Sequence, residues 1–205
     1  MALPKLNSGF DAAAYLAWED TQAERNEYIA GEVLAMVGVR QSHNVATGNL
    51  YSILRRELKG SPCRVFIESV KTRVEAADCF FYPDVAVTCD ARDRQTPDYI
   101  SHPILVIEVL SDSTAAFDRG AKFAAYRKLE SLQEYVLVDV AAQRVEVFRR
   151  NPENHWVLYD YEAGDTLELA ALALKVEMSE VLDDTEDATE PPNAAENGKT
   201  TESHE

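Results

Sequence analysis

The residues of this chain whose types and spacing best suit catalysis are two carboxylates and a lysine, Asp84, Glu108 and Lys122. Asp84 follows a proline at the start of a predicted strand, and Glu108 interrupts the apolar run 104–110, which predicts a buried strand. A carboxylate inside a buried strand is costly unless it is paired or holds a metal ion. Side by side on neighbouring strands, the two carboxylates could share Mg²⁺ or Mn²⁺, because such hard cations prefer oxygen ligands.

The third candidate, Lys122, lies on a predicted helix over 115–129 that follows the strand of Glu108. Asp118, Lys122 and Tyr126 stand four residues apart and therefore share one stripe of that helix. An ammonium group near the carboxylates could orient an attacking water or stabilise negative charge that develops at phosphorus. Together the three groups are the minimum equipment for metal-dependent hydrolysis of a phosphodiester.

Each candidate also has a purely structural explanation, and the residues alone leave both readings open. Asp84 could serve a turn after a proline, as Asp often does, and Lys122 could form a surface pair with Asp118 worth about 0.3–0.5 kcal/mol. His43, at the start of another predicted helix, is more often a packing residue than a ligand. Glu108 is harder to explain in this way, because carboxylates are rarely buried without a partner.

The elements that must position these residues alternate between helices and strands. The patterns predict a helix over 8–23 capped by Ser8, a hairpin over 26–36 with Ala30-Gly31 at its turn, and a helix opened by His43 with Ser42 as its cap. They also predict a turn over 78–82, a polar loop over 91–102, and strands over 64–75, 83–89, 104–110, 134–140, 144–149, 155–161 and 166–176. This order indicates an α/β or α+β fold with a mixed sheet.

Charge divides the chain into two parts. The net charge is −16, and residues 183–205 carry −7 of it without an aliphatic side chain larger than alanine. Such a segment cannot bury enough apolar surface to offset the cost of ordering, so we expect a folded domain over 1–182 and an acidic disordered tail over 183–205. The domain itself carries −9, which makes it a poor non-specific binder of nucleic acid.

The cysteines and the apolar runs indicate the compartment. No apolar run approaches the roughly 18 residues of a membrane-spanning helix, and the first residues lack the charged-then-apolar design of a signal peptide. Cys63, Cys79 and Cys89 form no CxxC pair. We therefore expect three reduced thiols, mostly buried, in a cytoplasmic protein that has no contact with a membrane.

Short motifs in a fixed order resemble the Uma-type family of restriction-endonuclease-like proteins, in the PD-(D/E)XK superfamily. The motifs are Pro83-Asp84, Ile107-Glu108-Val109-Leu110-Ser111, Asp118-Arg119-Gly120-Ala121-Lys122 with Tyr126, the run EYVLVD at 134–139, the run EYIAGE at 27–32, and the helix opened by His43. The resemblance covers about residues 10–182. It implies a restriction-endonuclease-like core with a central mixed β-sheet flanked by helices, an additional N-terminal hairpin and C-terminal strands.

The resemblance also implies a magnesium-dependent endonuclease that hydrolyses DNA. Asp84 and Glu108 would ligate Mg²⁺ or Mn²⁺, Lys122 would assist the water or the transition state, and His43 and Glu32 would be further catalytic residues. DNA would be the substrate, and a homodimer would place two sites for cleavage of both strands. The chain departs from the superfamily pattern at position 110, since the usual lysine two residues after the glutamate is replaced by leucine, and Lys122 matches the position to which the family moves it.

Two other readings stay open. The chain could be a catalytically degenerate nuclease-fold protein that acts as a binding or regulatory module, which Leu110 and the acidic domain favour. Alternatively, the acidic tail could mimic nucleic acid and mask a basic partner or the groove of its own domain. A measurement of metal binding through Glu108 distinguishes the degenerate protein, which should not bind the ion, from a nuclease, which should.

Overall fold

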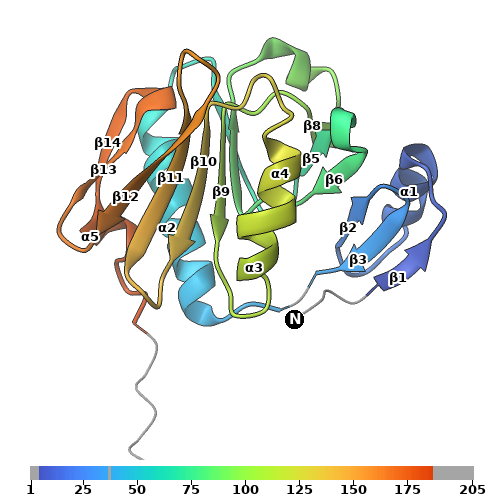
Figure 1. The fold of residues 1–205 in the computed structure, drawn as a ribbon, viewed down its shortest axis with the longest axis horizontal. Coiled ribbons are helices and arrows are strands. Elements are labelled where there is room, and N and C mark those ends of the chain that lie inside the picture. The colour runs from blue at the N-terminus through green and yellow to red at the C-terminus, as the bar shows by residue number, and fades with distance from the viewer. Residues whose placement is uncertain (1–4, 37, 187–205) are drawn as a thin grey trace, which may run out of the picture.

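The structure is a computed structural model that describes residues 5–36 and 38–186, and its strands form two six-stranded sheets and one hairpin (Figure 1). In spatial order, the strands of the first sheet are β1 (Lys5–Ser8), β3 (Glu32–Ala35), β2 (Asn26–Ile29), β6 (Cys79–Phe81), β5 (Lys71–Val74) and β8 (Tyr99–Ile100). The second contains β12 (Trp156–Glu162), β11 (Arg144–Arg150), β10 (Glu134–Asp139), β9 (Leu105–Val109), β7 (Val85–Thr88) and β4 (Arg64–Ile67). The hairpin is β13 (Thr166–Leu169) with β14 (Leu174–Glu177).

Each sheet is mixed, since β9 and β10 are parallel in the second sheet and β5 and β8 in the first, while the other pairings are antiparallel. The helices are α1 (Ala12–Glu19), α2 (Gln41–Glu57), α3 (Ala115–Phe117), α4 (Phe123–Tyr126) and α5 (Met178–Val181). Short helical turns are η1 (Glu75–Ala77), η2 (Ala91–Arg94), η3 (Asp118–Lys122) and η4 (Ala170–Leu172). The predicted α/β fold with a mixed sheet is confirmed. Within the described residues, none of these helices is both long enough and apolar enough to cross a membrane.

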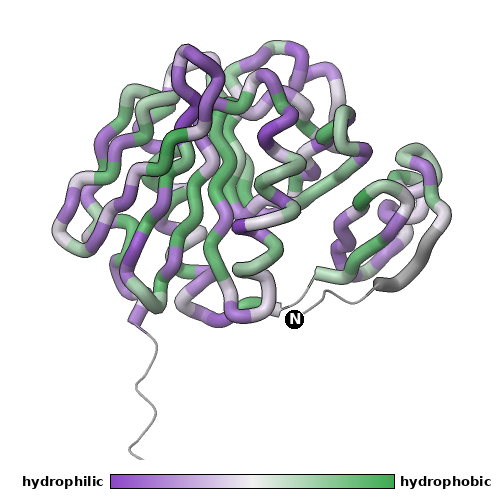
Figure 2. Tube along the Cα trace, in the orientation of Figure 1, coloured by the Kyte–Doolittle hydropathy of each residue, from purple (hydrophilic) through white to green (hydrophobic). Residues whose placement is uncertain are grey.

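Strand β9 lies inside the second sheet and is buried on both faces, as its near-continuous apolar run predicts. Leu105, Ile107 and Val109 belong to the apolar cluster that includes residues of α2, whereas Val106 belongs to the cluster formed with α4. Figure 1 shows α2 and α4 on opposite sides of this sheet, and Figure 2 shows its middle strands as mainly hydrophobic. Glu108, two residues after Val106, therefore faces the α4 side.

Several boundaries differ from the sequence prediction. Ser8 lies in β1 and does not cap α1; the cap is Asp11, whose Oδ1 accepts a hydrogen bond from the Ala14 amide at 2.7 Å. Helix α2 starts at Gln41, so Ser42 is already inside it. The predicted turn over 78–82 contains β6 instead, because its residues pair with β2 and β5.

Two predicted strands are in fact pairs of strands. The segment 64–75 divides into β4 and β5, which belong to different sheets, with Glu68 at φ +48° between them. The segment 166–176 divides into β13 and β14 around η4, with Ala173 at φ +54°. The spacing of the large apolar residues lengthens from two to three at each break, from Ile67 to Val70 and from Leu169 to Leu172. Neither left-handed position is a glycine, so the usual turn signal is missing.

The predicted tail begins on the surface of the domain. The amide of Asn49 donates to the Asp183 carbonyl at 2.7 Å, and Thr185 is buried. Packing therefore continues to about Thr185, beyond the predicted boundary at residue 182. The rest of the predicted tail, 187–205, lies outside the described residues.

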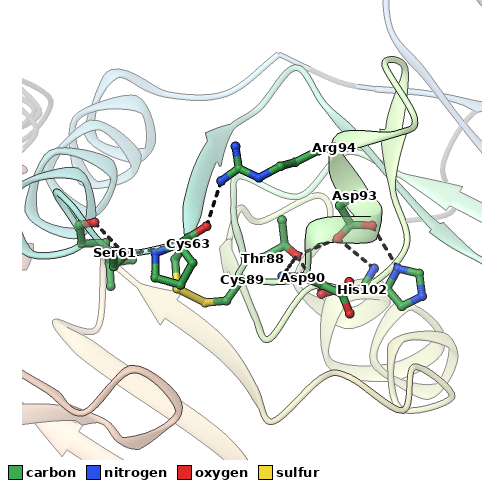
Figure 3. Close-up of a disulfide and its surroundings, with 10 residues drawn as sticks. Ser61, Cys63, Thr88, Cys89, Asp90, Asp93, Arg94 and His102 are labelled. Carbon is green, nitrogen blue, oxygen red and sulfur yellow. Dashed lines mark hydrogen bonds and ion pairs between the residues drawn. A yellow bond between two sulfur atoms is a disulfide. The ribbon is translucent and has the colours of Figure 1, made fainter.

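The expectation of three reduced thiols is wrong for two of them, because Cys63 and Cys89 form a disulfide (Figure 3). The buried Cys79 is free. The pairing follows from the sheet register, because Arg64 lies opposite Thr88 and the two cysteines come next. Opposite residues of an antiparallel pair bring their Cβ atoms within about 4.5–5.5 Å. Spacing along the sequence could not reveal this contact, which depends on β4 pairing with β7.

We expect reduction of this disulfide to lower the free energy of unfolding by about 3 kcal/mol, because the bond closes a loop of 26 residues and restricts the unfolded chain. Urea unfolding with and without reductant measures the difference. The double variant Cys63→Ala/Cys89→Ala is the control, since reductant should not change its unfolding. Three titratable thiols in protein denatured without reductant would contradict the bond.

Candidate active site

The two predicted ligands lie on neighbouring strands. Val85 of β7 pairs with Ile107 of β9 in antiparallel register, which places Asp84 next to Glu108 at the following position. The Val109 amide donates a hydrogen bond to Asp84 Oδ2 at 2.7 Å, so the backbone of β9 holds this carboxylate directly. The predicted pairing of the two strands is confirmed.

Lys122 points into the protein and reaches the same place. Its Nζ lies 3.0 Å from Glu108 Oε1, 3.0 Å from Glu27 Oε1 and 3.7 Å from Asp118 Oδ1. The reading of Asp118 and Lys122 as a surface pair is wrong, because both residues are buried. The ammonium thus comes from the helix that covers the α4 face of the sheet, the face on which Leu110 also packs.

The turn that carries Lys122 is a π-helical segment, η3, between α3 and α4. The sequence predicts one regular α-helix over 115–129. Nothing in the sequence indicates that the turn at 118–122 is a wider, π-helical one. Such π-bulges are rare and occur frequently at functional sites. Here the segment places both Asp118 and Lys122 toward the sheet.

The first sheet contributes a carboxylate, Glu27, which accepts a hydrogen bond from the Tyr82 amide at 3.1 Å. The residue predicted from this hairpin is Glu32, which starts β3 opposite Ile29. Glu27 pairs with Leu34, two positions along β3 from Glu32, a separation of roughly 7 Å at about 3.4 Å per residue. The signal that could have favoured Glu27 is its position directly before the apolar pair Tyr28-Ile29, which predicts a buried stretch of strand.

His43 lies in the first turn of α2 and contacts the site from the side opposite Lys122. Its Nε2 is 3.3 Å from Asp84 Oδ2, and the side chain is buried. Burial by itself would lower the pKa of His43, but the hydrogen bond and the charge of Asp84 outweigh it and raise the pKa.

We expect Asp84→Asn to lower the pKa of His43, because burial remains after the carboxylate is removed. Since the pKa of His43 in the folded protein lies above its unfolded value, the stabilisation from this pair is present below about pH 6.5 and is lost as the pH rises through the folded pKa. Titration of the imidazole signals by NMR in the two proteins measures the shift. An unchanged pKa in Asp84→Asn would contradict the contact.

The candidate site residues described above line one pocket of about 60 Å³, except Glu32, which is not part of its lining. Met36, Val39 and Phe117 are among the apolar residues of the pocket. A water needs roughly 10–15 Å³ of such space, so the pocket has room for an ion with a few waters. The pocket residues that carry the polar chemistry are Glu27, His43, Asp84, Glu108, Asp118 and Lys122.

The pocket has more negative than positive charge. Among the described residues that line it, four carboxylates face Lys122 and a histidine. Burial raises the pKa of Glu108, and the carboxylates of Asp118, Asp84 and Glu27 add to this effect against the opposing charge of Lys122. Burial also raises the pKa values of Glu27 and Asp118.

Burial by itself would lower the pKa of Lys122, but Glu108 and Glu27 outweigh it and raise the pKa well above its ordinary value. Lys122 therefore stays protonated at neutral pH. Its single charge faces four carboxyl groups, three of which have raised pKa values, so the pocket favours uptake of protons or of a further cation.

The donor set fits a hard divalent cation. Glu108 Oε1 is buried and, within the described part of the chain, makes no hydrogen bond of good geometry, although Lys122 lies 3.0 Å away. No group of three or more His, Cys, Asp or Glu residues in the described ranges is arranged to hold a metal by itself. Two carboxylates that leave the remaining positions to water and substrate oxygens match the way proteins bind Mg²⁺.

Known proteins are similar to this chain in sequence and in fold. Residues 12–180 match the Uma2 family, described as "Putative restriction endonuclease". Two uncharacterized proteins of Synechocystis, slr1290 and sll1609, are 38% and 32% identical to this chain over 160 and 169 residues. These alignments cover 78% and 80% of this chain, and 84% and 94% of those proteins.

The fold is also similar to a solved structure from Anabaena variabilis that is described as a putative nuclease of family DUF820. The TM-score is 0.69 at 19% sequence identity, with 84% of this chain and 97% of that chain covered. At this identity the likeness establishes the fold alone.

Proposed function

The chain belongs to the Uma2 family, and on that premise we propose that it is a metal-dependent endonuclease that hydrolyses phosphodiester bonds of DNA. The observation that supports this proposal most strongly is the pocket in which Asp84 and Glu108 lie on adjacent strands beside a buried, protonated Lys122. Carboxylates paired with an ammonium in this way suit phosphoryl chemistry, which needs positioning and charge stabilisation more than covalent catalysis.

Asp84 and Glu108 would hold Mg²⁺ or Mn²⁺, with Glu27 and Asp118 as the surrounding negative charge. When bound, such an ion supplies Lewis-acid polarisation of a phosphoryl oxygen. The Val109 amide fixes Asp84 at 2.7 Å, so this carboxylate needs little rearrangement to bind.

Lys122 acts as a fixed cation in this proposal. Because its pKa is raised well above the ordinary value, the side chain does not take up a proton at neutral pH and cannot serve as the general base. Its ammonium would instead stabilise the negative charge that develops on the phosphate oxygens. His43 would orient Asp84 through the 3.3 Å contact.

Cleavage of supercoiled plasmid and of single-stranded DNA, with Mg²⁺, Mn²⁺ or a chelator, tests the proposal. Wild type should nick DNA only with the metal, and Asp84→Asn and Glu108→Gln should lose this activity while circular dichroism shows a retained fold. Glu153→Gln, in an exposed loop, is the control for the loss of one negative charge. Equal cleavage by wild type and both site variants would overturn the assignment.

A comparison of Glu27→Gln with Glu32→Gln separates the two glutamates of the hairpin. We propose that Glu27 belongs to the site, because it contacts Lys122 at 3.0 Å and lines the pocket. Loss of cleavage in Glu32→Gln with normal cleavage in Glu27→Gln would contradict this proposal and support Glu32, the residue predicted from the sequence.

The alternative is a degenerate nuclease fold that binds without cleaving, which the net charge of −9 on residues 1–182 favours. Calorimetric titration with Mn²⁺ distinguishes it, since a degenerate site should not bind the ion through Glu108. A homodimer and a cytoplasmic location stay predictions of the sequence.

A further inference from the structure

Helix α1 ends in a carboxyl group that the proposed chemistry does not use. Glu19 is the last residue of α1, it is buried, and it is not part of the pocket lining. Both its burial and its place are unfavourable, because burial removes a carboxylate from water and the C-terminal end of a helix carries partial negative charge. Glu19 therefore needs compensating contacts.

These contacts are hydrogen bonds from two residues. The backbone amide of Asn26 donates to Glu19 Oε1 at 2.9 Å, and the side-chain amide of Asn26 donates to Oε2 at 3.1 Å. The Tyr82 hydroxyl donates to Oε1 at 3.0 Å. One helical turn before Glu19, the Tyr15 hydroxyl donates to the Asn26 carbonyl at 2.5 Å. Helix α1 thus holds the backbone of Asn26 and the side chain of Tyr82 at the same time.

Asn26 and Tyr82 are also the two residues on which the place of Glu27 depends. Asn26 precedes Glu27 in β2, and the Tyr82 amide donates to Glu27 Oε1 at 3.1 Å. The same oxygen lies 3.0 Å from Lys122 Nζ. Functional side chains keep their geometry when packing and hydrogen bonds fix the groups that support them. Glu19 supplies such bonds to both supports of Glu27.

We infer that Glu19 is a positioning residue that holds Glu27 against Lys122 and touches neither the metal ion nor DNA. It acts through the two residues that bond to its carboxyl group, Asn26 and Tyr82. The inference rests on the proposed function, because Glu27 has a role in catalysis only if this pocket is the active site. A misplacement of about 1 Å can lower a rate roughly a hundredfold, so the effect should appear in kcat.

DNA cleavage by Glu19→Met and Glu19→Gln at saturating Mn²⁺ tests the inference. Methionine retains the size of the side chain and removes both acceptor oxygens, so kcat should fall at least about tenfold. Glutamine keeps one acceptor for the Asn26 amide and the Tyr82 hydroxyl. Asn26 Oδ1 is buried without a hydrogen-bond partner among the described residues, and once its side chain turns it can accept from the new amide nitrogen. Glu19→Gln should therefore keep a kcat much closer to that of wild type.

Asp11→Ala is the matched control for a loss of stability in α1. It removes the N-terminal cap, in which Asp11 Oδ1 accepts from the Ala14 amide at 2.7 Å, and leaves every contact of Glu19 in place. This variant should cleave DNA as wild type does. A loss of kcat equal to that of Glu19→Met would assign the effect to the stability of the helix and overturn the inference.

The double variant Glu19→Met/Glu27→Gln tests whether Glu19 acts through Glu27. It should cleave as slowly as Glu27→Gln alone, because residues that act through one contact are not additive. Additive losses would overturn the inference, as would wild-type kcat in Glu19→Met beside a loss in Glu27→Gln. Absence of metal-dependent cleavage by wild type overturns the proposed function, and unchanged cleavage in Glu27→Gln removes Glu27 from the site; either result takes the inference with it.

A second measurement does not depend on cleavage or on the folding of Glu19→Met. Tyr82→Phe removes one oxygen and keeps the ring and the amide that bonds to Glu27. In ¹⁵N NMR spectra of protein labelled at lysine Nζ, the Lys122 signal should shift in Glu19→Met and in Tyr82→Phe and should stay in place in Asp11→Ala. An unmoved Lys122 signal in Tyr82→Phe would contradict the link from α1 to Glu27.

Discussion

Lys122→Met is expected to lower the free energy of unfolding by about 3–5 kcal/mol and to abolish cleavage. The ammonium lies within 3.7 Å of Glu27, Glu108 and Asp118, and all four side chains are buried. Methionine retains much of the stem volume but removes the positive charge, so the carboxylates would be left without compensation. Removing one partner of a buried ion pair is among the most destabilising changes known for single residues.

The pH dependence of Lys122→Met tests the cause of this loss. The carboxyl pKa values of Glu27, Glu108 and Asp118 are already raised in the folded protein. A carboxyl whose folded pKa exceeds its unfolded value stabilises the fold most below the unfolded pKa, and this stability is lost as the pH rises through the folded pKa. The variant should therefore be least stable at neutral and higher pH and regain stability on acidification.

Urea unfolding of Lys122→Met at several pH values, compared with Lys128→Met, measures the effect. Lys128 is exposed and bonds to the Ala76 carbonyl at 3.3 Å, so its replacement should change stability little. Mn²⁺ should restore part of the stability of Lys122→Met, because a bound divalent cation replaces the lost charge. Equal stability of the two variants would contradict the burial of Lys122 among the carboxylates.

Glu108→Gln is expected to change activity and stability in opposite directions. Loss of a metal-binding carboxylate should reduce Mn²⁺ affinity and cleavage by at least about a hundredfold, the upper end of the effect of residues that only support a ligand. The metal-free protein should become more stable by roughly 1 kcal/mol, as often happens when a strained functional residue is replaced. Lys122 would keep Glu27 at 3.0 Å and Asp118 at 3.7 Å, so its own charge stays compensated.

The sign of the stability change follows from the pKa of Glu108, which burial raises well above the ordinary value. In wild type this carboxyl contributes most to stability below its unfolded pKa, and the contribution falls as the pH rises toward the folded pKa. Glutamine removes that dependence. The gain in the midpoint of thermal unfolding should thus be larger at pH 8 than at pH 5, measured with chelator present, and a loss of stability at both pH values would contradict the excess of negative charge.

Periodicity and motif order predicted the strands that carry the site, because both signals are local. A nearly continuous apolar run marked β9, and the proline before Asp84 marked the start of β7. Their pairing was predicted only as the arrangement in which the two carboxylates could share a cation, because the loop 91–102 separates the strands. The burial of Lys122 was only implied by family resemblance, since a lysine stripe on a helix looks the same whether it faces solvent or a sheet.

What the sequence could not predict depends on contacts between distant segments. Glu27 enters the site because the first sheet lies beside the second, and the Cys63–Cys89 bond depends on the pairing of β4 with β7. The division of 64–75 into strands of two sheets also depends on tertiary contacts. The break lies at Glu68, which takes a left-handed conformation, and the sequence has no glycine there to indicate it. The choice of Glu32 over Glu27 was a consequence of treating the hairpin alone.

The assembly of the pocket from separate sheets also has a consequence for the time course of folding. Glu27 and Lys122, which contact each other at 3.0 Å, are 95 residues apart in the sequence. Contacts between such distant residues form late, because the entropy of closing long loops must be offset before they stabilise anything. A nascent chain that has emerged only as far as β9 contains Glu27, Asp84 and Glu108 but lacks the ammonium that joins them. The site would thus be complete only after the helix that follows β9 has docked.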